Sequence, residues 1–306
     1  MQDYAFLGLG VVCAAAGGEL FVRSVVGLAL AARVSAAIVG VTFAAFATSS
    51  PELAVAISAA TLQKPQIALG DALGSSVVNV ALILGLALVI SPIQSPRSSL
   101  KRDLPVALGV PVGTAFLCID GVLSRIDGAL LFGLFILWLV AVVMDAHRQR
   151  SASGASESPS GWRAAICGAV GLVLLFGAGQ LIVSGARAIA ESMGITEFVI
   201  GATIVAVGTS VPELATTLIA KLRGHDEVGL GTVLGSNIFN GLWIVPVAAV
   251  IHPIEFEWRE VAVALAFGVL AMLIVYPPRQ GLIGRGRGVL LLIIYCVYVG
   301  AIVLMG

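Results

Sequence analysis

The stretch VGVTFAAFATSSPELAVAIS, residues 39–58, decides how this chain is organised, because it occurs twice. Its second copy is IGATIVAVGTSVPELATTLI, residues 200–219, at an offset of 161 residues. The same offset aligns ALGDALGSSVVNVALILG (68–85) with GLGTVLGSNIFNGLWIVP (229–246) without a gap. Agreement over so many positions at one offset indicates an internal duplication of the chain.

The composition requires a lipid bilayer as the solvent for both copies. Of the 306 residues, 59% are hydrophobic and only 11% are charged, with a mean hydropathy of +1.06. A soluble domain usually carries about a quarter charged residues, so a soluble fold could not bury this much apolar surface. The formal net charge is zero, which argues against nucleic acid as a partner. The four cysteines lie far apart, without the spacing of a zinc or redox motif.

A membrane-spanning helix needs about 20 mostly apolar residues, and the sequence predicts ten such spans. They are residues 4–30, 36–62, 66–90, 104–119, 126–144, 162–186, 195–221, 227–250, 259–276 and 288–305. The hydrophilic stretch 147–161 predicts a cytoplasmic linker between a first half, 1–146, and a second half, 162–306. Five spans per half is an odd number, so the second half must enter the membrane from the opposite side. The predicted fold is an all-α membrane protein of two inverted five-helix repeats, as is typical of secondary transporters.

The basic residues predict the orientation, because cytoplasmic loops collect Lys and Arg. With the N-terminus outside, twelve basic residues fall in inner loops and four fall in outer loops. We therefore expect both termini on the outer side of the membrane. The opening MQDYAF lacks the positive region of a cleavable signal, so the first span is expected to stay in the mature protein. Glu19 and Arg23, one turn apart in that span, are expected to pair with each other.

Each copy interrupts a predicted span with a polar segment, which ends in Pro51-Glu52 or in Pro212-Glu213. A proline has no N–H and leaves a carbonyl one turn earlier without its helical partner. A proline kink patched by Ser or Thr hydroxyls is one interpretation. The glutamates favour another, because a charge at mid-membrane costs at least ~2.5–3.5 kcal/mol, and no basic residue lies in the repeat helices to pair with them. An oxygen-liganded cation is the remaining partner, and two carboxylates balance one divalent charge.

The next helix of each copy adds further oxygen atoms. Asp71, Ser75 and Asn79 recur at four-residue spacing and form one stripe, and Ser236 and Asn240 do the same in the second copy. Carboxylate, hydroxyl, amide and carbonyl oxygens, without Cys or His, are the ligands that hard cations such as Ca²⁺ and Na⁺ prefer. For Asp71, a position at the level of the lipid headgroups is the alternative to a role in tuning the response to pH or K⁺.

At these motifs the sequence resembles the prokaryotic sodium/calcium exchangers of the cation/Ca²⁺ exchanger superfamily. The likeness is carried by TSSPEL with GDALGSSVVN and by GTSVPEL with GTVLGSNIFN. It implies a secondary antiporter of a prokaryotic cell (inner) membrane, which exchanges Na⁺ for Ca²⁺ by alternating access without catalytic residues or a cofactor. The implied ligands are Glu52, Glu213 and the carbonyls of Thr48 and Thr209 for Ca²⁺; Ala45, Ser49, Ser75, Ala206, Ser210 and Ser236 for Na⁺; and Asn79 and Asn240 in the middle of the cluster.

Other activities remain as alternatives. A H⁺/Ca²⁺ exchanger of the same superfamily is expected to have a carboxylate in the helix that here carries Ser75 and Ser236, whose hydroxyls suit Na⁺. A K⁺-dependent exchanger has Asp at the position of Asn240. Ala47 and Ser76 also depart from the glycine and the asparagine that the resemblance leads us to expect. Outside the superfamily, a cation channel would need no inverted gates, and an intramembrane hydrolase is disfavoured because no Ser-His or paired-Asp arrangement appears.

Overall fold

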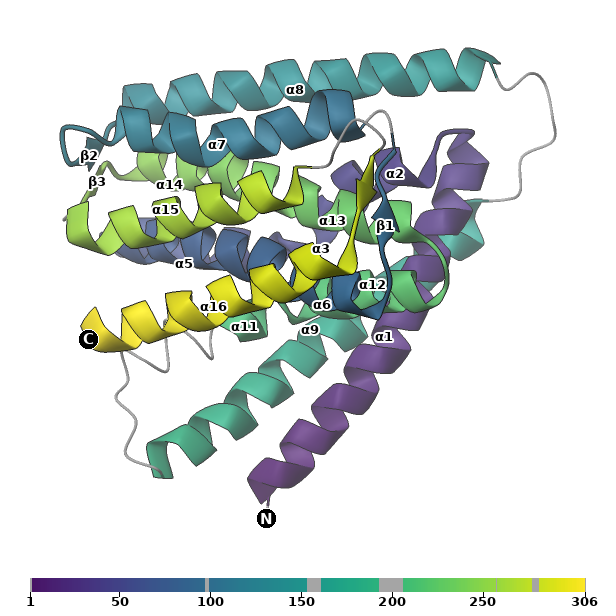
Figure 1. Cartoon of the computed structure of the whole chain (residues 1–306), viewed down its shortest axis with the longest axis horizontal. Coiled ribbons are helices and arrows are strands. Elements are labelled where there is room, and N and C mark those ends of the chain that lie inside the picture. Colours follow the sequence, from purple (N-terminus) through teal and green to yellow (C-terminus); the bar gives the residue numbers. More distant parts are fainter. Residues whose placement is uncertain are drawn as a thin grey trace.

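The computed structural model is almost entirely helical (Figure 1) and describes residues 2–96, 99–152, 161–192, 206–256, 258–276 and 281–305. The first half contains α1 (Gln2–Ala32), α2 (Ala36–Val39), the π-helix η1 (Gly40–Ala44), α3 (Ala45–Thr48), α4 (Ser50–Thr61), α5 (Pro65–Val77), the π-helix η2 (Val78–Leu84), α6 (Gly85–Ile90), β1 (Ile93–Gln94), the π-helix η3 (Ser99–Asp103), α7 (Leu104–Leu117), β2 (Val122–Leu123) and α8 (Arg125–Ala152). The second half contains α9 (Gly161–Ser192), α11 (Ala206–Thr209), α12 (Val211–Leu222), α13 (Asp226–Phe239), the π-helix η5 (Asn240–Ile244), α14 (Val245–Ile251), β3 (Ile254–Glu255), α15 (Trp258–Val275), β4 (Leu282–Ile283) and α16 (Arg285–Met305).

The helices follow the predicted spans closely. By length and composition, six helices in the described part of the chain can cross a membrane, and the bent pair Ala36–Thr48 and Ser50–Thr61 makes a seventh. The predicted spans 104–119 and 259–276 correspond to the shorter helices α7 and α15. The predicted span 195–221 begins among residues outside the description and continues as α11 and α12.

The predicted linker 147–161 is wrong at its first boundary. The helix α8 runs on to Ala152, and α9 begins at Gly161, so that only residues 153–160 are left between them, outside the described ranges. The helix continues because its polar end lacks the Gly or Pro that would stop it before Ser151. The side chains of Arg148 and Arg150 are therefore carried by a helix.

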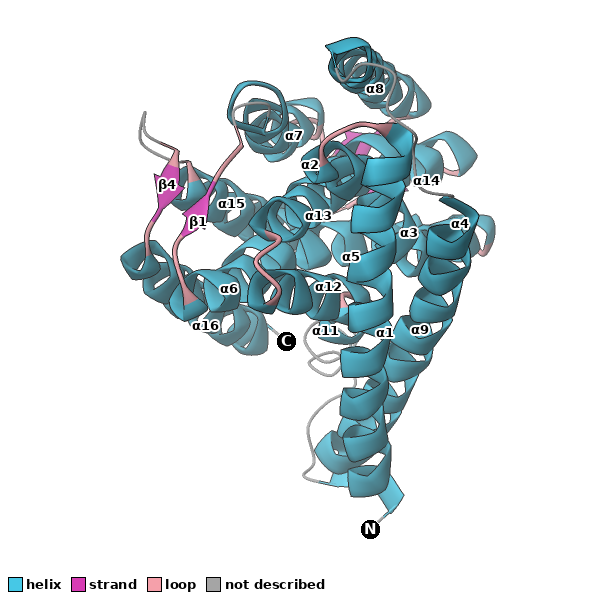
Figure 2. Cartoon of the chain, turned by 90° about the vertical axis from the view of Figure 1, so that its right-hand side faces the viewer, coloured by secondary structure: helices cyan, strands magenta, loops and turns pink. Residues whose placement is uncertain are grey.

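Two short antiparallel ribbons tie the halves together. Strand β1 of the first half pairs with β4 of the second, with Ile93 opposite Ile283. Strand β2 of the first half pairs with β3 of the second, with Val122 opposite Glu255. The β2–β3 ribbon lies at the left end of the helices in Figure 1, and Figure 2 shows β1 beside β4. Each half therefore contributes one strand to each ribbon.

The first helices of the two halves, α1 and α9, form a pair that lies side by side in both views (Figures 1 and 2). They cross at glycines. A Cβ added to Gly17 would lie 2.9 Å from the carbonyl oxygen of Gly171, and a Cβ added to Gly171 would lie 2.9 Å from the carbonyl oxygen of Gly17. Glu19 of α1 accepts a hydrogen bond from Arg23 at 2.6 Å, as predicted from their spacing. It also accepts one from Arg223, just beyond α12, at 2.8 Å, which joins α1 to the second repeat.

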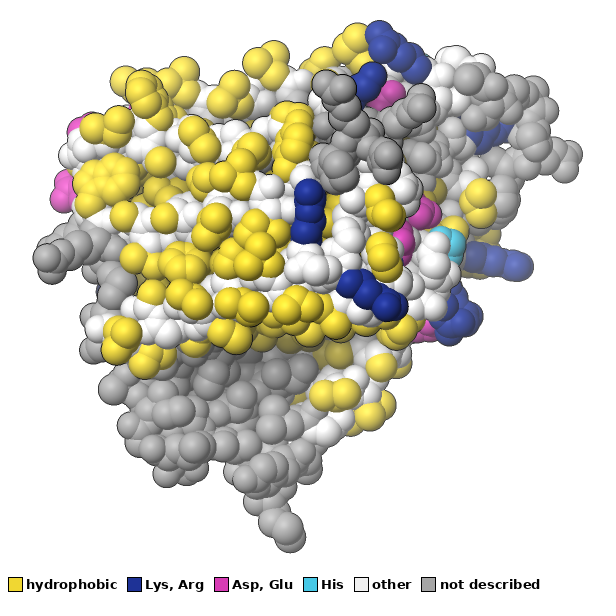
Figure 3. Space-filling view, viewed as in Figure 1, with side chains coloured by type: hydrophobic (Ala, Val, Ile, Leu, Met, Phe, Trp, Pro, Cys, Tyr) yellow, Lys and Arg dark blue, Asp and Glu magenta, His cyan; other side chains and the backbone are white. Residues whose placement is uncertain are grey.

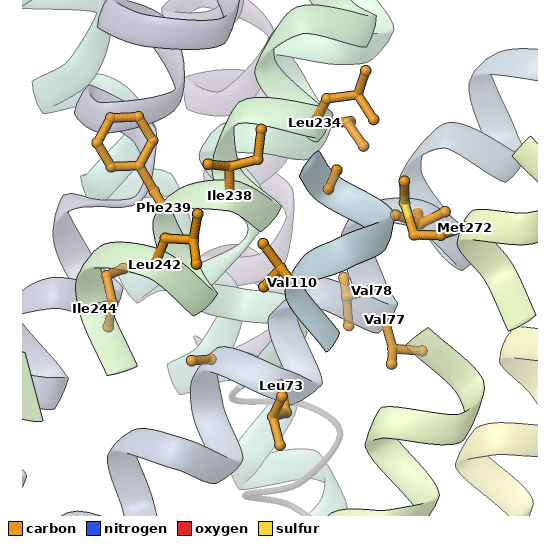
Figure 4. Close-up of a cluster of buried hydrophobic side chains, with 14 of the residues drawn as sticks. Leu73, Val77, Val78, Val110, Leu234, Ile238, Phe239, Leu242, Ile244 and Met272 are labelled. Atoms are coloured by element: carbon orange, nitrogen blue, oxygen red, sulfur yellow. The ribbon is translucent and has the colours of Figure 1, made fainter. Parts of the chain in front are cut away.

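The core is apolar inside, and the outer faces of the helices are apolar as well. Figure 4 shows Val78 of η2 and Ile238 of α13 within one cluster, with Val110 of α7 at its centre. Figure 3 shows hydrophobic side chains over the face formed by α7, α15 and α16, while Lys and Arg gather toward the right-hand side. Side chains such as Leu273 and Ile293 are about half exposed there. Such a surface is expected of helices that contact lipid.

The first prediction concerns Gly235, where α13 packs directly on the first repeat. A Cβ at this position would contact the carbonyl oxygen of Val41 and the Cβ of Ala45, so Gly235→Ala must push the two helices apart. Overpacking of this kind costs typically about 1–3 kcal/mol, and we expect a lower thermal midpoint for the purified protein in detergent.

The matched control is Gly133→Ala in α8, where no described atom lies within 4 Å of the added Cβ. It should leave the midpoint unchanged or raise it, because alanine favours a helix over glycine by up to ~1 kcal/mol. Equal midpoints for the two variants would contradict the close packing of α13 on η1 and α3.

Candidate cation site

Both polar segments interrupt their helices, and the two breaks have the same geometry. Ser49 separates α3 from α4 with φ −85° and ψ 11°, and Ser210 separates α11 from α12 with φ −85° and ψ 8°. The bend at the first break is 45°. Pro51 and Pro212 lie in the first turn of the following helix, where a missing N–H removes no helical bond within the new helix. Each proline therefore starts a second helix rather than kinking a continuous one.

The breaks bring the two glutamates into the interior of the protein. Glu52 and Glu213 lie in the first turns of α4 and α12 and are only 1% and 0% exposed. Each carboxylate faces hydroxyl groups of the opposite half. Thr48 and Ser49 lie against Glu213, and Thr209 lies against Glu52. The Ser49 hydroxyl donates to Oε1 of Glu213 at 3.0 Å. The two halves thus exchange polar contacts across one cluster.

Many of the predicted ligands carry a buried oxygen that has no hydrogen-bond partner among the described residues. These atoms are Oε2 of Glu52 and Glu213, Oγ of Ser75 and Ser210, and Oδ1 of Asn79 and Asn240. A buried polar atom without a partner costs about 1–3 kcal/mol, so a concentration of them requires an explanation. All six are oxygens, two of them from carboxylates, and oxygen is the ligand type that hard cations such as Ca²⁺ take. The predicted residues therefore fit a hard cation.

The side-chain oxygens of Asn79 and Asn240 are left free to accept because their N–H groups bind other parts of the protein. The two asparagines lie in the π-helices η2 and η5, a geometry that is frequent at functional sites. The Asn79 Nδ2 donates to Oδ1 of Asn237 at 3.2 Å, and the Asn240 Nδ2 donates to the Ala72 carbonyl and the Ser76 hydroxyl, each at 3.3 Å. Because the amide N–H groups are bound by the protein, the amide oxygens remain as acceptors.

The predicted carbonyl ligands Ala45 and Ala206 are placed alike in the two halves. The Ala45 oxygen accepts the Thr48 hydroxyl at 3.3 Å, and the Ala206 oxygen accepts the Thr209 hydroxyl at 3.1 Å. Each also accepts the backbone N–H of the serine at the break, at 3.0 and 3.3 Å. A Na⁺ ion at either carbonyl must therefore compete with a threonine hydroxyl.

Ser236 joins this site as predicted, and one further residue of the site was missed. The Ser236 hydroxyl donates to Oε1 of Glu213 at 3.2 Å. Asn237, besides accepting from Asn79, donates to the Ser76 carbonyl at 3.2 Å and so links the two repeats. A signal was available in the sequence. The repeat aligns Asn237 with Ser76, so the two halves differ at this position.

Asp71 lies near enough to the cluster to interact with both glutamates. It is half-buried on α5, one turn before Ser75, and interacts electrostatically with Glu52 and Glu213. Among the described residues, no three His, Cys, Asp or Glu side chains lie close enough to hold one metal ion. Asp71 is therefore a charge that neighbours the two glutamates, and its role in tuning the response to pH or K⁺ stays a prediction.

One basic residue does lie in a repeat helix, contrary to the sequence analysis. Lys221 is in the last turn of α12 and is 7% exposed. Its Nζ atom binds both carboxylate oxygens of Asp226, at 2.9 and 3.1 Å, and the Pro92 carbonyl at 2.9 Å. Lys221 therefore pairs with groups outside the cluster. Neither Glu52 nor Glu213 has an ion-pair partner in the part of the chain that the structure describes.

The family model described as "Sodium/calcium exchanger protein" matches residues 3–144 and 163–304, nearly the whole of both halves. This chain belongs to the sodium/calcium exchanger family. The family is one of transporters rather than enzymes, and the chain is an integral membrane protein. The resemblance noted from the repeat motifs is thereby confirmed.

Individual members of the sodium/calcium exchanger family are similar along most of their length. The chain is 34% identical over 268 residues to the inner membrane protein YrbG of Escherichia coli, covering 83% of this chain and 82% of the relative. It is 28% identical over 340 residues to the sodium/calcium exchanger MaX1 of Methanosarcina acetivorans, covering 97% of each. The structure of the sodium-calcium exchanger NCX_Mj, soaked with 2.5 mM Na⁺ and 10 mM Sr²⁺, is 32% identical and superposes with a TM-score of 0.84, covering 98% of this chain and 99% of that chain.

The second prediction separates two neighbouring serines. Ser49→Ala removes a hydroxyl that contacts Glu213, whereas Ser50→Ala removes one that donates to the Phe46 carbonyl at 3.0 Å, outside the cluster. We expect Ser49→Ala to raise the Na⁺ concentration for half-maximal exchange by roughly tenfold, because the free energy of one hydrogen bond to a charged group corresponds to about that factor. Ca²⁺ keeps its carboxylates and should be affected less.

The measurement is Ca²⁺ uptake into Na⁺-loaded proteoliposomes over a series of Na⁺ and Ca²⁺ concentrations. Ser50→Ala should behave as the wild type. A Ser49→Ala protein with altered Ca²⁺ affinity and unaltered Na⁺ dependence would remove Ser49 from the sodium ligands.

Proposed function

We propose that this chain is a ten-helix, inverted-repeat antiporter that exchanges Na⁺ for Ca²⁺ by alternating access at the cluster around Glu52 and Glu213. The observation that carries the proposal is the set of buried oxygens without partners, contributed by both halves around two carboxylates without a basic partner. A cation is the one class of ligand that such a set attracts. The repeat supplies two nearly equivalent ways to open the site.

The ligand assignment follows the charges. Two carboxylates neutralise one Ca²⁺ or two Na⁺, so the two ions are alternative occupants of one cluster. Ca²⁺ takes Glu52, Glu213 and the carbonyls of Thr48 and Thr209. Na⁺ takes the flanking oxygens of Ala45, Ser49 and Ser75 on one side and of Ala206, Ser210 and Ser236 on the other, with Asn79 and Asn240 between them. A third Na⁺ in this set would make each cycle move net charge, so an inward Na⁺ gradient would drive Ca²⁺ outward.

Alternating access is supported by the pairing of corresponding elements. The helices α4 and α12 begin at positions offset by 161 residues, as do α5 and α13. The two ribbons pair β1 with β4 and β2 with β3, so an exchange of the halves maps one ribbon onto the other. This is the pattern expected of two halves related by a twofold axis, which inverted repeats in a membrane have.

The orientation is part of the proposal. Twelve basic residues against four favour the side where α8 ends and α9 begins as cytoplasmic, which places both termini outside. The similarity to an inner membrane protein of E. coli supports the cell membrane as the location.

The third prediction tests the central carboxylates. Glu52→Gln and Glu213→Gln each replace a charge by a neutral group of the same shape, so Ca²⁺ loses about half of its charge compensation. We expect both variants to fold and to lose Na⁺-driven Ca²⁺ uptake. Glu255→Gln, at the exposed residue of strand β3, is the matched control and should transport normally.

Uptake is measured into Na⁺-loaded proteoliposomes with choline, Na⁺, K⁺ or Li⁺ outside and with the pH gradient clamped. Uptake by the wild type that follows the pH gradient and ignores Na⁺ would favour the H⁺/Ca²⁺ alternative. Conduction without saturation or countertransport would favour a channel. Near-normal flux in either glutamate variant would contradict the assignment of the site.

The fourth prediction concerns K⁺. Asn240 contributes an amide oxygen but no charge, so the two glutamates suffice for Ca²⁺ without a co-transported K⁺. We expect wild-type exchange to proceed without K⁺. Asn240→Asp places a third carboxyl against the Ala72 carbonyl, which the amide now contacts as a donor, and should make exchange strongly dependent on pH. Strict K⁺ dependence of the wild type, or an unchanged pH profile in the variant, would contradict this role.

A further inference from the structure

A small cavity lies beside Asn240, between α5, α7, α15 and the junction of α13 with η5. The volume open to a water molecule is about 20 Å³, and one buried water needs about 10–15 Å³. The polar residues of its lining are Ser76, Thr114, Asn237 and Asn240. We propose that the cavity holds one water molecule, through which Thr114 positions the side chain of Asn240. This inference rests on the proposed function, in which Asn240 belongs to the cation cluster.

One face of α7 forms a wall of the cavity, because four of the lining residues recur at helical spacing: Ala107, Val110, Pro111 and Thr114. Val110 sets how closely this face approaches η5. A Cβ added to Gly241, the neighbour of Asn240, would collide with the Val110 side chain. Because Val110 already fills that space, α7 is held at a fixed distance from η5, and Thr114 and Asn240 share the cavity one turn further along.

Two polar groups on this face of α7 need a partner. The hydroxyl of Thr114 is 1% exposed and has no hydrogen-bond partner among the described residues. Pro111 lies inside the helix and has no N–H to donate to the carbonyl of Ala107 one turn earlier. Ala107 is also only 1% exposed, so bulk solvent does not supply the missing donor. Buried polar groups of this kind are normally paired, with protein or with an ordered water.

Asn240 provides the third group. Its Nδ2 donates to the Ala72 carbonyl and the Ser76 hydroxyl, whereas its Oδ1 has no partner among the described residues. An amide oxygen has two lone pairs, so it can accept from a water on one side and bind a cation on the other. In the proposed network the Thr114 hydroxyl donates to the water. The water donates one hydrogen to the Ala107 carbonyl and the other to Oδ1 of Asn240, which completes the three bonds that a buried water typically makes.

The lining favours a neutral occupant over an ion. The described residues that surround the cavity include no Asp, Glu, Lys or Arg, and most are apolar, such as Leu73, Val245 and Met272. An ion in such surroundings would lose its hydration without a compensating charge. A water molecule both donates and accepts, as the hydroxyl, the carbonyl and the amide oxygen together require. The water then holds the Asn240 amide with its second lone pair directed to the cluster.

The experiment compares crystal structures of the full chain, at a resolution that shows ordered water, grown with Na⁺ or with choline. Thr114→Val removes the hydroxyl and keeps the shape of the side chain, and Thr114→Ser keeps the hydroxyl. The matched control is Thr42→Val, whose hydroxyl donates to the Ile38 carbonyl at 2.6 Å, outside the cavity. Thermal midpoints and the Na⁺ and Ca²⁺ dependence of Ca²⁺ uptake are measured for the same four proteins.

We expect one water peak within hydrogen-bond distance of Thr114, Ala107 and Asn240 in the wild type and in Thr114→Ser, with either cation. In Thr114→Val the peak should weaken, the Asn240 amide should shift, and the midpoint should fall, because the water loses a partner. Half-maximal Na⁺ should rise about fivefold, the factor that corresponds to one neutral hydrogen bond, with a smaller change for Ca²⁺. Thr114→Ser and Thr42→Val should keep the wild-type Na⁺ dependence.

A peak that appears only with Na⁺ would overturn water as the occupant. If Thr114→Val raises the midpoint, the hydroxyl was buried without a partner in a dry cavity, and the proposal fails. An Asn240 amide that keeps its position in Thr114→Val would overturn the positioning role. Wild-type uptake that ignores Na⁺ would contradict the proposed function instead, because the water peak and the position of the amide are read from the structures.

Discussion

The structure depends on two buried carboxylates, Glu52 and Glu213, which have no basic partner among the residues that the structure describes. Burying such a charge costs free energy, and the dipoles of the surrounding helices and hydroxyls lower that cost. The chain breaks at Ser49 and Ser210, so that Glu52 and Glu213 lie at the positive ends of new helices. The hydroxyls of one half turn toward the carboxylate of the other. In the proposed function the remaining oxygens coordinate the transported cation, so the stability of the site and transport are expected to depend on the same groups.

The two halves are similar without being equal, and some of the differences lie at or near the site. Ser49 donates to Glu213, whereas its repeat counterpart Ser210 has a hydroxyl without a partner. Asp71 corresponds at the same offset to Thr232, which is buried and donates to the Val228 carbonyl. Glu19, which holds Arg223, corresponds to Gln180. In the proposed alternating-access cycle, the two conformations related by exchange of the halves are therefore expected to differ in free energy at these pairs.

The two helix breaks and the buried glutamates could be predicted from the sequence, because their signals are local. The breaks follow from Ser-Pro and Val-Pro steps inside apolar spans, and the glutamates are recognisable because an uncompensated charge there is costly. Contacts between segments that are distant in the sequence were harder to predict. Nothing near Arg223 in the chain indicates Glu19, and the π-helices that turn Asn79 and Asn240 depend on packing between repeats. Lys221 was not expected in a repeat helix; it is buried in the last turn of α12, where it contacts Asp226 and the Pro92 carbonyl.

Equilibrium binding of Ca²⁺ to the purified protein, repeated over a series of Na⁺ concentrations, tests the central claim most directly, because it requires no assumption about gating. The account predicts one Ca²⁺ per chain, displaced by Na⁺ along a sigmoidal curve, since more than one Na⁺ must enter the cluster to replace it. Ca²⁺ binding that is indifferent to Na⁺, or that persists unchanged when both Glu52 and Glu213 are replaced by glutamine, would contradict the account.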